Sequence, residues 1–166
     1  EAAEEGIRRI HEEVPDITVG AGTVRSVEQL ERASGAGAKF IVTPGFNRKV
    51  VEAAVKRHLP IYPGVVTPGE IENVAEYGIC TVKFFPAEAS GGTSTLKALA
   101  GPYGEMSFIP TGGVGEKNFE DYLALKNVIA VGGSWLTKPN EDGELDYRLI
   151  EERASRVSDI IAELRG

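Results

Sequence analysis

The sequence has few of the residues from which disulfide-built and metal-binding proteins are made. Its single cysteine, Cys80, excludes an intramolecular disulfide and argues against a cysteine-built metal site. Its two histidines, His11 and His58, lie in helix-like surroundings, so we expect no zinc site. No apolar run approaches the roughly 20 residues that a membrane span needs, and no secretory signal is visible at the start. We therefore expect no metal or other cofactor, no membrane contact and a reduced, cytoplasmic setting.

The length and the net charge of the chain limit the classes of protein to which it can belong. The chain has 166 residues, of which 42% are hydrophobic and 26% charged, which is ordinary for a globular protein. This length is enough for one domain with its own core, so we predict a single domain over residues 1–166. The net charge of −7 argues against nucleic acid as a partner. A small-molecule ligand is the remaining expectation.

Strand-like and helix-like segments alternate along the chain. Six apolar, β-branched segments are each followed by a helical pattern, and a further helix opens the chain at Glu1. Ser26, Asn47 and Thr67 stand where helices are expected to begin. This alternation predicts an α/β fold with a parallel sheet and right-handed crossovers. Because the first strand is not followed by a GxGxxG fingerprint, we favour a (β/α) barrel with about six βα units over a doubly wound sheet. The strand-like segments are residues 17–24, 39–45, 60–66, 80–88, 106–114 and 128–136.

Glycine, proline and hydroxyl residues gather at the carboxyl end of each predicted strand, which is where ligands bind in parallel α/β folds. The last two segments end in PTGGVGEKN and GGSWLTK. Their glycines would leave backbone N–H groups open to an anion, and a serine would add a hydroxyl. These two loops predict a phosphate site formed by Gly112, Gly113, Gly133 and Ser134.

Lys83 lies in the strand-like segment CTVKFFPAE, between Val82 and Phe84. Desolvation of a lysine in such a segment lowers its pKa and makes the neutral amine available, which is the form that attacks a carbonyl to give a Schiff base. The alternative is an edge-strand lysine whose stem covers apolar surface while its ammonium group reaches water. By strand parity, Lys83 and Phe85 point to one face, and Val82 and Phe84 to the helix layer.

Five segments together closely resemble 2-keto-3-deoxy-6-phosphogluconate (KDPG) aldolase, which in many species also cleaves 4-hydroxy-2-oxoglutarate (KHG). They are GAGTV at residues 20–24, FIVTPGFN at 40–47, VKFFPAE at 82–88, PTGGV at 110–114 and GGSWL at 132–136. The resemblance implies a (β/α)8 barrel, a homotrimer, and a metal-independent class I aldolase that forms pyruvate and glyceraldehyde 3-phosphate. It implies that Lys83 is the Schiff-base residue. It further implies that Thr23, Pro44 and Thr111 meet the pyruvyl carboxylate and carbonyl region, that Phe85 lines the pocket, and that Gly112, Gly113 and Ser134 hold the phosphate.

The resemblance also implies a strand, a helix and a second strand before the helix at Glu1, carrying a catalytic glutamate and a carboxylate-binding arginine for which this sequence has no match. We expect the 166-residue chain by itself to be a poor aldolase and an unstable monomer, completed by such a segment. Water or Glu88 would be poor substitutes for the base. Two other readings stay open: a truncated, inactive aldolase-like scaffold that only binds ligand or assembles, and another phosphate-binding barrel enzyme such as an isomerase or synthase.

Overall fold

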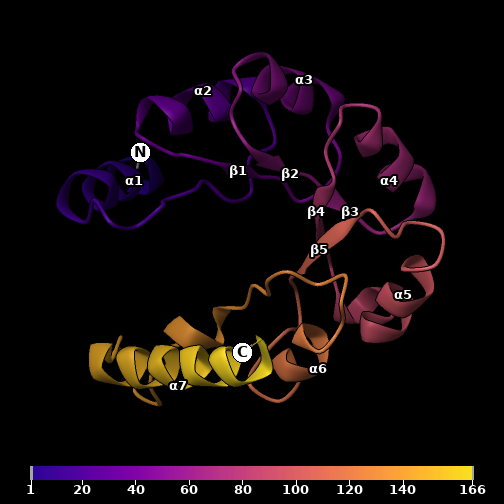
Figure 1. The fold of residues 1–166 in the computed structure, drawn as a ribbon. Coiled ribbons are helices and arrows are strands. Elements are labelled where there is room, and N and C mark those ends of the chain that lie inside the picture. The colour runs from indigo at the N-terminus through magenta and orange to yellow at the C-terminus, as the bar shows by residue number, and fades with distance from the viewer. Residues whose placement is uncertain (1, 166) are drawn as a thin grey trace. The chain divides into compact units, whose positions relative to one another are not determined.

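The structure, a computed structural model, describes residues 2–165 and consists of two compact units that divide between Phe85 and Pro86. The first unit combines helices with short parallel strands, and the second contains helices and the single strand β5 among its described residues (Figure 1). The α/β class with parallel pairing predicted from the sequence is confirmed.

The first unit contains α1 (Ala2–Glu13), α2 (Val27–Gly35), β1 (Ile41–Val42), α3 (Arg48–Lys56), β2 (Ile61–Tyr62), β3 (Gly64–Val65), α4 (Pro68–Ala75) and β4 (Thr81–Phe84). Strand β1 pairs in parallel with β2, so that Ile41 lies opposite Ile61. Strand β3 pairs in parallel with β4, so that Gly64 lies opposite Lys83. Strands β2 and β3 are separated only by Pro63, whose carbonyl accepts a hydrogen bond from Lys83 N at 2.9 Å. This one segment therefore connects β1 to β4.

The helices of this unit begin at the residues that the sequence indicated. Ser26, Asn47 and Thr67 are the N-caps of α2, α3 and α4, and each side chain accepts a hydrogen bond from a backbone N–H of the first turn. In α4, Thr67 and Glu70 form a reciprocal capping box. Burial acts to raise the pKa of Glu70, but hydrogen bonds from the backbone of Thr67 and Val66 outweigh it and lower the pKa.

The core of the first unit lies between these helices and one face of the strands. Helices α2 and α3 lie along the same side of β1 and β2 (Figure 1). Val55 of α3 lies off the apolar face of this helix, because it is 41% exposed while its neighbour Ala54 is fully buried. One residue further along a helix turns the side chain by about 100°. The cluster is formed by Ala21, Val24, Leu30, Ala33, Ala38, Ile41, Val50, Val51, Ala54 and Ile61.

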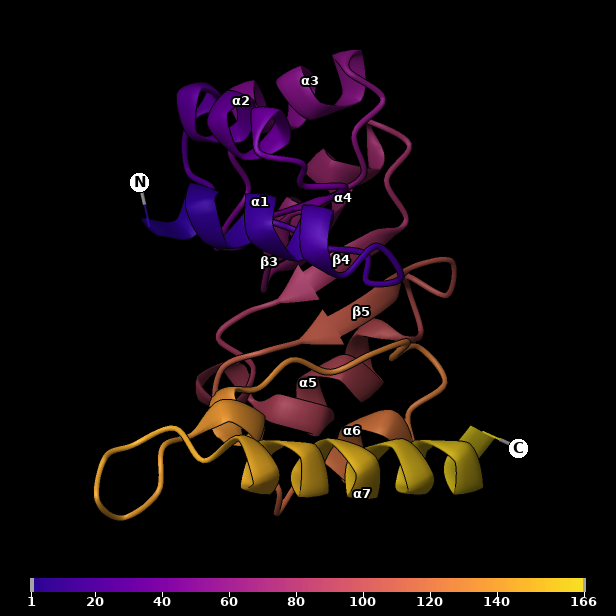
Figure 2. The same cartoon turned by 90° about the vertical axis from the view of Figure 1, so that its left-hand side faces the viewer.

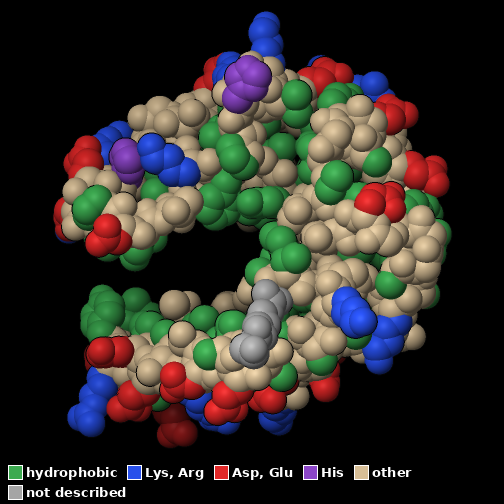
Figure 3. Space-filling model, viewed as in Figure 1, with side chains coloured by type: hydrophobic (Ala, Val, Ile, Leu, Met, Phe, Trp, Pro, Cys, Tyr) green, Lys and Arg blue, Asp and Glu red, His purple; other side chains and the backbone are tan. Residues whose placement is uncertain are grey.

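The second unit contains η1 (Glu88–Ser90), α5 (Gly92–Leu99), β5 (Ser107–Pro110), α6 (Phe119–Leu123), η2 (Ser134–Thr137) and α7 (Tyr147–Arg165). Its buried side chains include Leu96, Phe108, Phe119, Tyr122 and Val128. Helix α7 contacts η2, and Figure 2 shows its whole length. Side chains of both charges occur along this helix (Figure 3), which is typical of a solvated outer helix.

Two of the six predicted strands are present only as single parallel bridges. In the first, Ala21 bridges Ile41, and in the sixth, Val128 and Gly132 bridge Phe108 and Thr111. Glycine weakens a strand because it has no side chain to pack, and these segments contain Gly20, Gly22, Gly132 and Gly133. Parallel pairing survives at these positions, but regular strands do not form.

Candidate functional site

The strands of the first unit have two unlike faces. One face is buried against the helices, and Val82 and Phe84 of β4 are fully buried there. The other face carries half-buried side chains, among them Tyr62, Lys83 and Phe85. The parity expected for β4 is thus confirmed, and Lys83 lies on the face that the helices leave uncovered.

Lys83 is half-buried, and its Nζ lies 4.3 Å from the centroid of the Phe85 ring. Burial lowers the pKa of Lys83 from its ordinary value of 10.5. The ring face attracts the ammonium form, yet desolvation prevails. The side chain is therefore partly accessible and enriched in the neutral amine, as a carbonyl-attacking lysine must be.

Pro44 lies at the end of β1, in a turn that is fastened to β3. The hydroxyl of Thr43, which is only 1% exposed, donates to Gly45 O at 2.8 Å and accepts from Gly64 N at 3.3 Å. A Cβ at Gly64 would lie 2.3 Å from Pro44 O, so this turn passes directly over the glycine that pairs with Lys83. Sequence reasoning chose Pro44 but missed Thr43 and Gly64, because both act through contacts between segments.

Thr23 is exposed and adopts a φ of +57°. A β-branched residue rarely takes this left-handed conformation, which costs on the order of 1–3 kcal/mol and tends to occur at functional sites. Val24 N donates to Val42 O at 3.1 Å immediately afterwards, so the chain turns at Thr23 without leaving the sheet.

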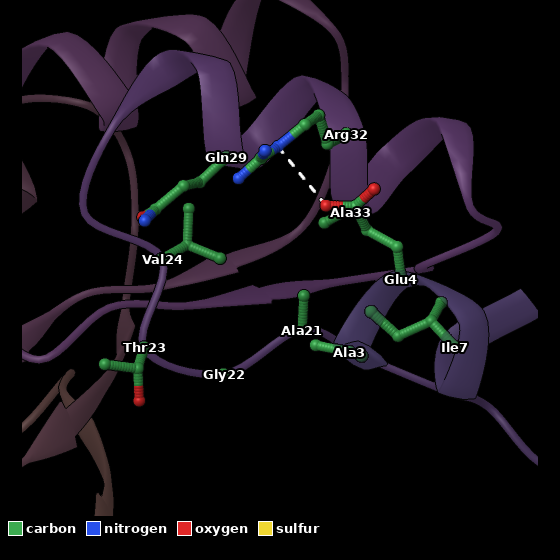
Figure 4. Close-up of a pocket in the computed structure, with 11 residues that line it drawn as sticks. Ala3, Glu4, Ile7, Ala21, Gly22, Thr23, Val24, Gln29, Arg32 and Ala33 are labelled. Carbon is green, nitrogen blue, oxygen red and sulfur yellow. Dashed lines mark ion pairs between the residues drawn. The ribbon is translucent and has the colours of Figure 1, made fainter. Parts of the chain in front are cut away.

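A pocket of about 370 Å³ adjoins Thr23 between α1, α2 and residues 20–24 (Figure 4). Glu4 of α1 and Arg32 of α2 point toward one another across it and form an ion pair at 3.3 Å. Alternate residues of a parallel strand bond to opposite sides. Since Ala21 bonds to Phe40 and Val42, the backbone of Gly20 and Gly22 faces this pocket.

In the second unit, Thr111 follows β5 and bridges Gly132. Its Oγ1 is buried and has no hydrogen-bond partner within residues 2–165. A buried hydroxyl without a partner costs about 1–3 kcal/mol, so this atom is a good candidate for a ligand contact.

Gly112 and Gly113, which the sequence predicts to bind phosphate and which are called the phosphate loop for that prediction, have φ angles of +89° and +83° and follow Thr111. Asn118 fastens the turn after this loop, because its Nδ2 donates to Gly113 O at 3.2 Å and its Oδ1 accepts from Gly115 N at 2.8 Å. Sequence reasoning placed Asn118 only at the end of the motif. Its position before a helix was the available signal.

Gly133 and Ser134 lie at the start of η2 and are exposed. A Cβ at Gly133 would lie 2.0 Å from the Trp135 ring, which stacks on Phe119 with centroids 5.7 Å apart. Trp135 therefore packs against Phe119 within the second unit. Arg153 of α7, which sequence reasoning did not consider, donates to Trp135 O at 3.1 Å and to Lys138 O at 2.9 Å and so holds this turn.

No group of three or more histidine, cysteine, aspartate or glutamate side chains within residues 2–165 could hold a metal ion. None of the described helices is long and apolar enough to cross a membrane. The single cysteine, Cys80, is a free, exposed thiol.

Comparison with known proteins identifies close relatives. Residues 1–152 match the family model described as KDPG and KHG aldolase. The 2-dehydro-3-deoxy-phosphogluconate aldolase of Dickeya dadantii is 48% identical over 148 residues, which are 88% of this chain and 70% of that protein.

Two solved structures also resemble this chain. KDPG aldolase of Zymomonas mobilis ZM4, crystallised with 3-phosphoglycerate, is 35% identical, with a TM-score of 0.86 over 92% of this chain and 71% of that one. KDPG aldolase of Legionella pneumophila, with pyruvate captured as a covalent carbinolamine intermediate, is 36% identical, with a TM-score of 0.80 over 97% of this chain and 73% of that one.

Proposed function

Because this chain belongs to the KDPG and KHG aldolase family, we propose that it is a class I aldolase that cleaves KDPG to pyruvate and glyceraldehyde 3-phosphate. It is a carbon–carbon lyase. The observation that carries the proposal is the half-buried Lys83 on β4, with its lowered pKa and its contact with Phe85. The isomerase or synthase alternative is not favoured, because the relatives at 40–48% identity are aldolases.

The reaction begins when the neutral Lys83 amine attacks the C2 carbonyl of the 2-keto acid. The carbinolamine hydroxyl takes up a proton and leaves as water, which gives a protonated imine. A base then takes the proton of the C4 hydroxyl, the C3–C4 bond breaks, and its electron pair moves into the imine as an enamine. Glyceraldehyde 3-phosphate leaves, C3 of the enamine takes up a proton, and hydrolysis of the imine releases pyruvate and Lys83.

The carboxylate and carbonyl end of the substrate is assigned to Thr23, Pro44 and Thr111, with Phe85 lining the pocket. Two observations support this assignment. Thr23 is held in a strained conformation, and Thr111 Oγ1 is buried without a partner within the described part of the chain. A substrate oxygen accepting from this hydroxyl would recover the cost of burying it.

The phosphate is assigned to the phosphate loop together with Gly133 and Ser134. The positive φ angles of Gly112 and Gly113 support this, because such backbone can present successive N–H groups to an anion. Ser134→Ala should weaken phosphate binding by about 0.5–1.5 kcal/mol, the worth of one hydrogen bond, or more if the bond is charge-assisted.

Covalent trapping tests the proposed lysine. Incubation with pyruvate and borohydride should add a reduced pyruvyl group to the peptide that contains Lys83. Lys83→Ala should abolish the label, whereas Lys39→Ala, which removes an exposed lysine before β1, should label like the wild type. Labelling that persists in Lys83→Ala would refute the assignment.

Titration with inorganic phosphate tests the second site. Gly113→Asp should abolish binding, since it sets a carboxylate against the anion and places a side chain where φ is +83°. Gly115→Asp adds the same charge to the same turn at a position with open space, and should weaken binding far less. Equal affinity in the two variants would exclude this site.

The finer architecture also stays a proposal. We propose a (β/α)8 barrel as a single domain, a homotrimer and a cytoplasmic setting. The parallel pairing of β1 with β2 and of β3 with β4 supports the barrel, and the family resemblance supports the trimer.

A further inference from the structure

Glu88 has no part in the reaction proposed above, yet its backbone N–H and its side chain contact the phosphate loop and a buried tyrosine. Glu88 N donates to Gly112 O at 3.1 Å, and the preceding Ala87 N donates to Thr111 O at 2.8 Å. The chain at the start of η1 is therefore bonded to the segment that is assigned to the substrate.

The side chain of Glu88 makes the second contact. A Cβ built on Gly113 would lie 2.5 Å from Glu88 Cγ and 2.6 Å from its Cβ. The methylene groups of Glu88 thus support Gly113 from one side, in the space that any other residue's side chain would occupy. The positive φ of Gly113 is maintained against this surface.

The carboxylate of Glu88 is directed to a different place. Its Oε1 accepts a hydrogen bond from the hydroxyl of Tyr122. Tyr122, on α6, is fully buried, so the position of its hydroxyl is fixed by the core of the second unit. A Cβ on Gly92 would lie 3.1 Å from both Glu88 Oε1 and the Tyr122 hydroxyl. A glycine at position 92 therefore leaves space for this hydrogen-bonded pair.

We propose that Glu88 and Tyr122 form a positioning pair, in which the stem of Glu88 holds the phosphate loop and the Tyr122 hydroxyl keeps the Glu88 carboxylate turned away from the bound phosphate. The inference rests on the proposed phosphate site and adds two residues to it. Without the tyrosine hydroxyl, a mobile carboxylate would stand beside an anion and repel it. The pair thereby sets the affinity for the phosphorylated end of the substrate and leaves imine formation untouched.

Tyr122→Phe removes only the hydroxyl and tests the pair. We expect the KM for KDPG and the Kd for inorganic phosphate to rise about tenfold, as for the loss of one hydrogen bond to a charged group. The kcat and the pyruvate label on Lys83 should change less than about twofold, because pyruvate has no phosphate. Tyr77→Phe is the matched control, since it removes another tyrosine–glutamate hydrogen bond, to Glu52 at 3.1 Å, outside the site.

Glu88→Gln removes the negative charge of Glu88 but keeps the methylene groups that contact Gly113. It also keeps an oxygen that can accept the hydrogen bond from Tyr122. Alone it should leave phosphate affinity equal or tighter, and combined with Tyr122→Phe it should recover most of the lost affinity. Thermal unfolding of each variant verifies that it folds. Glu88→Gln also tests the proposal without altering the core, should Tyr122→Phe fail to fold.

Several results would overturn the pair. These are an unchanged KM in a folded Tyr122→Phe, a double variant no better than the single one, or weaker phosphate binding in Glu88→Gln. An equal loss of pyruvate labelling and phosphate affinity would show that Tyr122 has only a structural role. If the wild type binds no phosphate and Gly113→Asp behaves like Gly115→Asp, the phosphate site itself is wrong, and the pair falls with it.

Discussion

Lys83, the proposed Schiff-base residue, illustrates how a side chain suited to chemistry can lower the stability of the fold. Its ammonium is partly desolvated, and the folded state therefore binds this proton less tightly than the unfolded chain does. Stability should rise with pH between the lowered pKa and the ordinary value of 10.5, because over that range the unfolded state binds more protons. At neutral pH the lysine is a destabilising residue.

We therefore predict that Lys83→Met raises the melting temperature at pH 7 and abolishes aldol cleavage. The gain should shrink as the pH rises from the lowered pKa of Lys83 toward and past 10.5, because above 10.5 the wild-type lysine is mostly neutral in both states. Thermal unfolding at pH 7 and pH 10 measures this. A gain that is equal at both pH values would mean that packing, and not charge, is responsible.

Thr23 shows the same exchange in the backbone. Its φ of +57° is strained for a β-branched residue, and this strain, on the order of 1–3 kcal/mol, exceeds the roughly 0.5–1 kcal/mol that glycine loses in chain entropy. Thr23→Gly should thus stabilise the protein slightly, while the KM for the 2-keto acid rises. His58→Gly relieves a similar angle, +54°, away from the proposed site, so it should stabilise without changing KM. An unchanged KM in Thr23→Gly would remove Thr23 from the site.

At the scale of the elements, the contact between the turn after β1 and strand β3 fixes where this turn lies relative to β4. Pro44 O stands where a Cβ on Gly64 would be, and the Thr43 hydroxyl ties the two segments. Gly64 is thereby placed between the β1 turn and β4, and it pairs with Lys83 of β4.

Gly64→Ala should consequently destabilise the protein by about 1–3 kcal/mol or more, since backbone atoms must move, and should impair pyruvate labelling at Lys83. Gly69→Ala is the control. Gly69 lies in α4 with open space around its Cβ position, and alanine is favoured there by up to about 1 kcal/mol. Denaturant unfolding compares the two. Equal free energies of unfolding in the two variants would show that the backbone of the turn can move aside at little cost.

At the scale of the whole molecule, exposed apolar residues indicate association. Three apolar side chains near the end of α1 are 40–54% exposed. They are Ile10 in the helix, and Val14 and Ile17 in the segment after it. Exposed apolar groups that lie together commonly mark contacts with another molecule. The homotrimer implied by the family resemblance would give such groups a partner.

We expect light scattering after size exclusion to give three times the chain mass of 17.8 kDa. Ile17→Glu should shift the population toward the monomer if this segment is in the contact, whereas Arg148→Glu, on exposed α7, should not. A monodisperse monomer of the wild type, unchanged on concentration, would refute the trimer.

The sequence by itself determined the periodicities, the caps and the face of Lys83. Ser26, Asn47 and Thr67 begin their helices because capping is a local matter of a side chain and the next three N–H groups. Lys83 lies opposite to the buried face because strand side chains alternate. The motifs then led to the aldolase family, which the comparisons bear out.

Only the tertiary structure decided what depends on contacts between distant segments. Three observations depend on residues that no local pattern relates. Glu88 is hydrogen-bonded to Gly112 and to Tyr122, and the Thr43 hydroxyl accepts from Gly64 N. Thr111 Oγ1 is buried without a partner among the described residues. The shortening of the first and last strands to single bridges belongs here as well, since pairing depends on the neighbouring strand as much as on β propensity. Local periodicity reports which way a side chain points, whereas its partners depend on the path of the whole chain.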